Sequence, residues 1–160
     1  MKQEFPTRTA ALDDALGAGR CFDMTARDLT IGGRRARLWV VNGYAQESIL
    51  ERMIAQWLAA PDLTDMKTPD AFLRSFVTAC DAAVCLKKEE AVLGVLSGKT
   101  LLVVDGWDGG ILMDVKQFPT RSIEEPDTSR VLRGSHDGFV ESIMKNAALL
   151  RRRIRDPALT

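Results

Sequence analysis

Residues that could do chemistry stand in three short stretches of this chain. The first, Gly94-Val-Leu-Ser-Gly98-Lys99-Thr100, resembles a phosphate-binding loop, and the apolar run after it ends at Asp105. A phosphate-binding loop has four residues between its glycines and leads from a strand into a helix. Here three residues separate the glycines, and Lys99 leads into a β-branched run. The pattern therefore favours a helix end followed by a strand start over a nucleotide site.

The second stretch, Ser135-His136-Asp137, contains the residue types of a hydrolytic triad. A triad needs a nucleophile, a base and an orienting acid that converge from separate segments, which three consecutive side chains cannot do. We therefore interpret the stretch as a loop in which Ser135 or Asp137 caps the last helix. No catalytic set is predicted elsewhere, and we expect no enzymatic activity.

The three cysteines do not form a metal-binding pattern. Cys21, Cys80 and Cys85 lack Cys-x-x-Cys spacing, and the single histidine, His136, is distant from them in the sequence. Structural zinc sites need paired cysteine and histidine ligands. We expect reduced, buried thiols and no metal or other cofactor.

The third stretch is a basic cluster of four arginines, Arg151, Arg152, Arg153 and Arg155. Consecutive arginines on one helical turn point around most of its circumference, so some must contact the protein. Arginine pairs readily with carboxylates, and one candidate partner is the acidic stretch 124–127. The alternatives are solvent, a partner subunit, a membrane surface or nucleic acid.

Charge is distributed unevenly, although the chain has 22 basic and 22 acidic residues. Residues 130–160 hold seven basic and three acidic side chains, so the rest of the chain is acidic. Nucleic acid is a poor match for the basic end, because no aromatic side chains interleave with its charges. We therefore expect no nucleic-acid partner.

Length and composition indicate one globular domain. The chain has 160 residues, of which 46% are hydrophobic, and this is enough for a core without disulfides or metals. No apolar run approaches the roughly 20 residues that cross a bilayer, and no signal-peptide core follows the first residues. We expect a soluble, unexported chain.

Apolar periodicity and turn residues predict the elements that position these stretches. Helices are predicted over 9–17, 46–59, 69–77, 89–96 and 137–155. Strands are predicted over 22–31, 34–42, 82–86, 100–105 and 111–115, with glycine-rich turns that make two hairpins. The apolar run over 100–105 predicts a central strand that is covered on both faces.

The order of these elements predicts an α/β (α+β) fold, in which a mixed β-sheet with two hairpins packs against about four to five helices. We expect an N-terminal arm or short helix over 1–20, a single domain over 21–157 and a tail over 158–160. The last helix should carry one apolar stripe, made of Phe139, Ile143, Ala147, Leu150 and Ile154.

Four segments of the C-terminal third carry a resemblance to a known family. They are Phe118-Pro-Thr-Arg121-Ser-Ile-Glu-Glu125-Pro126, Val131-Leu-Arg133-Gly134-Ser-His-Asp137-Gly138-Phe139-Val-Glu141, Asn146, and Leu150-Arg-Arg-Arg153-Ile154-Arg155-Asp-Pro157. This string at these intervals resembles the GerA family of spore germination proteins, most closely its SpoVAF-like branch. Weaker similarity extends back to Phe22, so the resemblance covers about 20–160.

The resemblance implies a part of a larger membrane protein. Family members have a two-part soluble region followed by membrane-spanning helices, in the inner membrane of the bacterial endospore. This chain would be the first soluble part, facing the cytoplasm or spore core, with its membrane segments missing. The implied partners are other germination-complex subunits and further copies of the chain, in a response to nutrients that involves no catalysis and no cofactor.

The resemblance and the basic cluster together define the candidate assembly residues. They are Arg121, Glu125, Arg133, Gly134, Asp137, Gly138, Phe139, Glu141, Asn146, Arg151, Arg152, Arg153 and Arg155. We single out Arg133, because an arginine beside a glycine in a tight segment is usually held by a carboxylate or by carbonyl groups. The alternative hypothesis is a small nucleotide- or nucleic-acid-binding protein that uses Lys99 or the arginine cluster.

Overall fold

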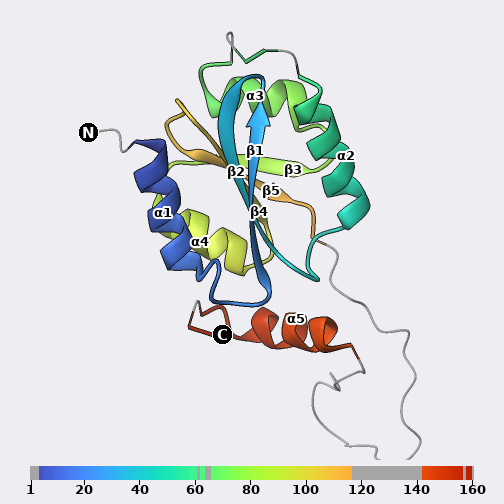
Figure 1. Ribbon diagram of the computed structural model, residues 1–160. Coiled ribbons are helices and arrows are strands. Elements are labelled where there is room, and N and C mark those ends of the chain that lie inside the picture. Colours follow the sequence, from blue (N-terminus) through green and yellow to red (C-terminus); the bar gives the residue numbers. More distant parts are fainter. Residues whose placement is uncertain (1–3, 61, 64–65, 117–141, 157, 160) are drawn as a thin grey trace, which may run out of the picture.

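Five strands form one sheet in the order β1-β2-β4-β5-β3, with helices on both faces, in the computed structural model (Figure 1). The structure describes residues 4–60, 62–63, 66–116, 142–156 and 158–159. The helices are α1 (Phe5–Leu16), α2 (Glu47–Leu58), α3 (Pro69–Phe76), α4 (Lys88–Leu96) and α5 (Ile143–Arg153). The strands are β1 (Met24–Ile31), β2 (Arg34–Val41), β3 (Asp81–Cys85), β4 (Thr100–Val104) and β5 (Gly110–Asp114).

The α+β class and the two hairpins are confirmed, and the sheet is antiparallel rather than mixed. Every pairing among the described strands is antiparallel. Strands β3 and β4 do run in the same direction, as expected of two strands joined by a single helix. Strand β5 returns from β4 through a hairpin and lies between them, so the parallel pair does not form.

The first hairpin shows how local sequence sets the register. Gly32 and Gly33 have φ of 51° and 77°, and a tight turn that matches the twist of two strands needs positive φ at both central residues. Strands β1 and β2 then pair along their full length, from Met24 opposite Val41 to Ile31 opposite Arg34. The Gly-Gly pair is therefore what brings these two strands together.

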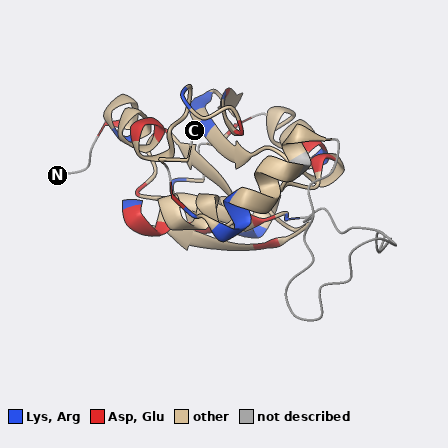
Figure 2. Cartoon of the chain, turned by 90° about the horizontal axis from the view of Figure 1, so that it is seen from below, with Lys and Arg blue, Asp and Glu red and all other residues tan. Residues whose placement is uncertain are grey.

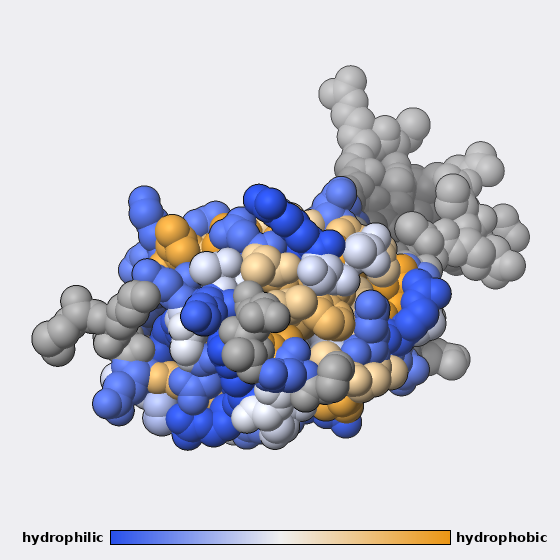
Figure 3. All heavy atoms as spheres, turned by 90° about the horizontal axis from the view of Figure 1, so that it is seen from above, coloured by the Kyte–Doolittle hydropathy of each residue, from blue (hydrophilic) through white to orange (hydrophobic). Residues whose placement is uncertain are grey.

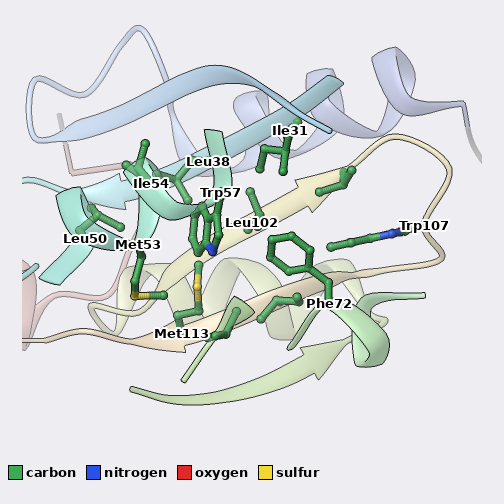
Figure 4. Close-up of a cluster of buried hydrophobic side chains, with 14 of the residues drawn as sticks. Ile31, Leu38, Leu50, Met53, Ile54, Trp57, Phe72, Leu102, Trp107 and Met113 are labelled. Atoms are coloured by element: carbon green, nitrogen blue, oxygen red, sulfur yellow. The ribbon is translucent and has the colours of Figure 1, made fainter. Parts of the chain in front are cut away.

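Helices α2 and α3 cover one face of the sheet with an aromatic core (Figure 4). The Phe72 ring lies 5.9 Å from the Trp57 ring and 5.1 Å from the Trp107 ring, centroid to centroid. Each indole also has a hydrogen-bond acceptor, because Trp57 Nε1 donates to the Phe76 carbonyl and Trp107 Nε1 to the Met66 carbonyl. Thr68 caps α3 by accepting from the Ala71 amide, as its position before Pro69 predicts.

Strand β4 is buried on both faces, which confirms its predicted central position. Leu102 and Val104 belong to the core under α2 and α3. Leu101 and Val103 belong to a second core on the opposite face, under α1 and α4. The near-continuous apolar sequence of this strand follows from having helices on both sides.

Helix α1 begins at Phe5, earlier than the predicted start at residue 9, and is part of the second core. Leu12 and Leu16 are buried against the sheet. Asp13 adds a polar attachment, because its Oδ1 accepts from Trp39 Nε1 over 2.8 Å and from Arg37 Nε over 3.1 Å. Helix α1 thus closes one side of the domain.

The outer surface is mainly hydrophilic. Seen from above, polar side chains cover most of the face, and apolar ones gather near its middle (Figure 3). In the described part of the chain, none of the helices has the length and apolarity needed to span a bilayer.

Gly109 offers a test of how tightly β3 and the second hairpin approach each other. A Cβ at Gly109 would lie 2.5 Å from the Cys85 carbonyl oxygen, and its φ is 101°. Gly33 has a φ of 77° and open space around it, so it isolates the cost of positive φ. In urea unfolding we expect Gly33→Ala to cost about 1 kcal/mol and Gly109→Ala at least about 2 kcal/mol. Equal costs would contradict the close approach.

Candidate interaction site

Helix α5 lies across the foot of the domain, below the sheet and the α1–α4 layer (Figure 1). It begins after Ser142 and ends at Arg153. Its last turn holds three arginines, which lie at the negative end of the helix dipole. Basic residues colour part of the ribbon blue in the view from below (Figure 2). The candidate site is built on this helix.

One of these arginines is buried and forms a two-point ion pair with Asp23, which lies directly before β1. Arg151 Nε donates to Asp23 Oδ2 over 2.8 Å, and Arg151 Nη2 donates to Asp23 Oδ1 over 2.7 Å. The two side chains are 1% and 3% exposed. This fork-to-fork geometry is the strongest form of the arginine–carboxylate contact.

The same guanidinium also fixes the chain after α5. Arg151 Nη1 donates to the Asp156 carbonyl over 2.8 Å, and Nη2 donates to the Leu159 carbonyl over 2.7 Å. Burial by itself lowers the pKa of Arg151, but the hydrogen bonds and the charge of Asp23 outweigh it, so the pKa is raised. Arg151 therefore stays charged and ties the sheet, the helix and the following residues together.

Tyr44 supplies a second attachment near the middle of α5. Its hydroxyl donates to the Ala148 carbonyl over 2.9 Å. Gly43 has a φ of 82°, and a Cβ there would lie 3.5 Å from Ala148 Cβ, so the loop after β2 approaches the helix closely. Burial raises the pKa of Tyr44 to about 12, and the neutral hydroxyl is the form that donates this bond.

The predicted apolar stripe of α5 is not its buried face. Ile143, Leu150 and Ile154 are 72%, 41% and 45% exposed. The helix instead turns Ala148 and Arg151 toward the domain. The physical reason is the ion pair, because it rotates the helix so that a charged side chain, and not the aliphatic stripe, meets the sheet. We call Ile143 and Leu150, together with Ile154 directly after the helix, the outer face of α5.

The predicted site residues divide into those on or directly after α5 and those outside the described residues. The second group holds Arg121, Glu125, Arg133, Gly134, Asp137, Gly138, Phe139 and Glu141. The acidic stretch 124–127, predicted to pair with the arginines, also lies outside the described residues, and the carboxylate that pairs with Arg151 is Asp23. Arg152, Arg153 and Arg155 are exposed, and Asn146 is half-buried.

Two contributors, Asp23 and Tyr44, are absent from the sequence-based prediction. Asp23 is 128 residues from Arg151 in the chain, and no spacing rule connects them. Asp23 stands between the apolar residues Phe22 and Met24, where a buried charge needs a partner, but Arg151 has Leu150 on one side and Arg152 on the other. No local signal therefore selects the pair.

The stretch that resembles a phosphate-binding loop is the end of α4 and the start of β4. The backbone N–H groups of Ser97, Gly98 and Lys99 donate to carbonyls in the last turns of α4, over 2.8–3.0 Å. A phosphate cradle needs such amides to point at the ligand. Among the described residues, no group of three or more His, Cys, Asp or Glu side chains could hold a metal ion.

Comparison with known proteins gives one family. The model of the Bacillus/Clostridium GerA spore germination proteins matches residues 10–160. Stage V sporulation protein AF of Bacillus subtilis (strain 168) is 33% identical over 147 residues, which are 90% of this chain and 29% of that protein. Spore germination protein B1 of the same organism is 32% identical over 126 residues, which are 79% of this chain and 26% of that protein.

A solved structure shares the fold. The N-terminal domain of the A subunit of the Bacillus megaterium spore germinant receptor GerK3 superposes with a TM-score of 0.68 at 20% identity, over 98% of this chain and 57% of that one. The chain thus spans less than a third of the curated relatives above and little more than half of this crystallised domain.

Removal of Arg151 should show how much the ion pair stabilises the domain. Arg151→Met leaves Asp23 charged and buried, so we expect a loss of about 3 kcal/mol or more in urea unfolding. Arg153→Met is the matched control on the same turn, where the exposed side chain should contribute at most about 1 kcal/mol. The double variant Asp23→Leu/Arg151→Met should recover part of the loss. Similar losses in the two single variants would contradict this account.

Tyr44 should make the domain less stable at alkaline pH. The unfolded state loses the tyrosine proton at about pH 10, whereas the folded state holds it to about pH 12. The free energy of unfolding should therefore fall as pH rises between these values. Tyr44 is the only tyrosine, so tyrosinate absorbance reports on it alone.

The control variant is Tyr44→Phe, which should lack both the absorbance change and this part of the pH slope. At neutral pH it should cost about 1 kcal/mol through the lost bond to Ala148. Titration of Tyr44 near pH 10 in a domain that stays folded would contradict the prediction.

Proposed function

The chain belongs to the GerA family of spore germination proteins, and from this premise we propose that it is a non-catalytic region of a germination membrane complex. Its relatives are named as spore germination and sporulation proteins. The proposed role is subunit assembly or signal transmission during the exit from dormancy. The observation that carries the proposal is how α5 is attached. The helix is held to the domain by the ion pair of Arg151, while its outer face is aliphatic and exposed.

The outer face of α5 supports the assembly part of the proposal. Two large aliphatic side chains on α5 and a third directly after it stay exposed, beside exposed arginines at the end of the same helix. Apolar side chains bordered by arginine are typical of protein–protein interfaces, where arginine is enriched among the charged residues. A partner polypeptide that covers this face would remove the aliphatic surface from water.

The ion pair supports the transmission part of the proposal. Arg151 joins α5 to Asp23 at the entrance of β1, and the bonds to the Asp156 and Leu159 carbonyls extend the link along the chain. A directional, two-point contact resists rotation of the helix more than an apolar contact does. A displacement of α5 would therefore be passed through Asp23 to strand β1, because the helix cannot slide over the sheet without breaking this contact.

We extend the proposal to the longer protein that its relatives represent. There, this region would face the spore core at the inner membrane, with membrane-spanning segments that follow in the longer chain. Other germination subunits and further copies of the same chain would be its partners. No nucleic acid and no cofactor enter the proposed role.

Replacement of the outer face of α5 tests this role. In the full-length protein expressed in spores, we expect Leu150→Gln/Ile154→Gln to lower co-purification with other germination subunits and to slow germination. The isolated 160-residue chain carrying the same changes should keep its stability within about 0.5 kcal/mol, because the side chains are already exposed.

The matched control is Leu93→Gln, at a leucine on α4 that is more exposed (57%), which should leave assembly and germination unchanged. Normal co-purification and normal germination in the α5 variant would overturn the proposal, and so would an equal defect in the α4 control.

A further inference from the structure

A cavity between α1 and α4 has the composition of a small-molecule site. It has a volume of about 130 Å³ and lies above strand β4, where α4 begins. Its floor is apolar and includes Leu12, Leu101 and Val103. The small residues Ala11 and Ala91 line its two helical walls, which is why the helices leave space here instead of filling it.

The rim of the cavity is cationic. Arg8 of α1 and the adjacent Lys87 and Lys88 at the start of α4 line it. Lys87 is also the N-cap of α4 and makes no side-chain capping bond, so the positive end of the helix dipole is not neutralised by its cap. The acidic residues of this turn, Glu89 and Glu90, do not line the cavity.

Arg8 keeps its positive charge beside the cavity without using all of its donors. Its Nη1 donates to the Trp107 carbonyl over 2.7 Å and its Nη2 to the Val104 carbonyl over 3.3 Å. Its Nε is buried and has no hydrogen-bond partner. Burial lowers the pKa of Arg8, and the negative charges of Asp108 and Asp105 only partly offset this effect. A bound anion nearby would therefore stabilise the charged guanidinium further.

The remaining polar group of the lining adds no negative charge. Cys85 is a free, buried cysteine at the end of β3, and its Sγ donates to the Lys87 carbonyl over 3.2 Å. Burial, together with the charge of Glu90, raises the pKa of this thiol to about 11, so it is neutral at physiological pH. The side chains that line the cavity are thus apolar, neutral or positively charged, and the carboxylate of Glu90 lies behind them beside the Cys85 thiol.

We propose that the α1–α4 cavity binds a small carboxylate with a short apolar body, in which the carboxylate meets Lys87 and Lys88 at the rim. The volume limits the body, because a cavity of about 150 Å³ holds one benzene molecule. Five- to six-carbon chains or a single ring therefore fit, and nucleotides do not. The inference is independent of the assembly role, because none of the residues that line the cavity belongs to α5.

Binding of hexanoate to the 160-residue chain tests the proposal directly. Amide NMR shifts at Lys88, Ala91 and Gly110 should saturate in the millimolar range, which is a typical affinity for so small a ligand. Hexan-1-ol lacks the charge and should bind at least about fivefold more weakly. Inorganic phosphate lacks the apolar body and should produce no saturable shift in these amides.

Variants of three kinds test the rim charges, the cavity interior and the net charge of the chain separately. Lys87→Gln/Lys88→Gln removes two exposed rim charges and should weaken hexanoate binding about fivefold or more. Ala91→Leu should fill the cavity and abolish binding, and Ala11→Leu provides the same test from the other helix if the first variant unfolds. Lys99→Gln, at the far end of α4, is the matched control and should bind normally.

Several outcomes would overturn the inference. They are the absence of saturable hexanoate shifts, equal binding of hexan-1-ol or phosphate, and unchanged affinity in the rim variant or in a folded cavity-filling variant. A loss of binding in Lys99→Gln equal to that in the rim variant would show that only the net charge matters, and it would also overturn the inference.

Discussion

The buried pair of Asp23 and Arg151 is the constraint on which the lower half of the structure depends. Removing two charges from water costs several kcal/mol per ion, and only good geometry with further hydrogen bonds offsets that cost. Here both carboxylate oxygens accept from the guanidinium, and two backbone carbonyls take further donors. The pair is therefore satisfied in one orientation of α5 only. The exposure of the aliphatic outer face and the course of the chain to Leu159 both follow from that orientation.

The parts of the fold that local rules govern could be predicted from the sequence. Gly32-Gly33 fixes a tight hairpin, Thr68-Pro69 begins α3, and the apolar run of β4 marks a strand covered on both faces. Helix α2 follows from its one-sided apolar spacing. In each case the determining residues lie within a few positions of the element that they define. The match to the GerA family rests on a longer string of residues and holds over residues 10–160.

The parts that depend on distant pairing could not be predicted. The order of strands places β5 between β3 and β4, and no local signal states which hairpin enters that space. The apolar periodicity of α5 is real, but periodicity shows only that a helix has an apolar side, not that this side faces its own domain. The acidic stretch 124–127, a candidate partner of the arginine cluster, lies outside the described residues, and the carboxylate that pairs with Arg151 belongs to Asp23, directly before β1.

The hydrogen bonds of the Leu159 carbonyl also have a mechanical meaning. Leu159 reaches the domain through Arg151 and through the Cys21 thiol, and both contacts lead to the segment that enters β1. Strand β1 is one border of the sheet, and β3 is the opposite border. A force applied at Leu159 would thus act first on the β1 edge of the sheet. It would reach the β3 edge only through the three strands between them, β2, β4 and β5. The domain is therefore attached to the residues after α5 at one edge of the sheet only, among the described contacts of Leu159.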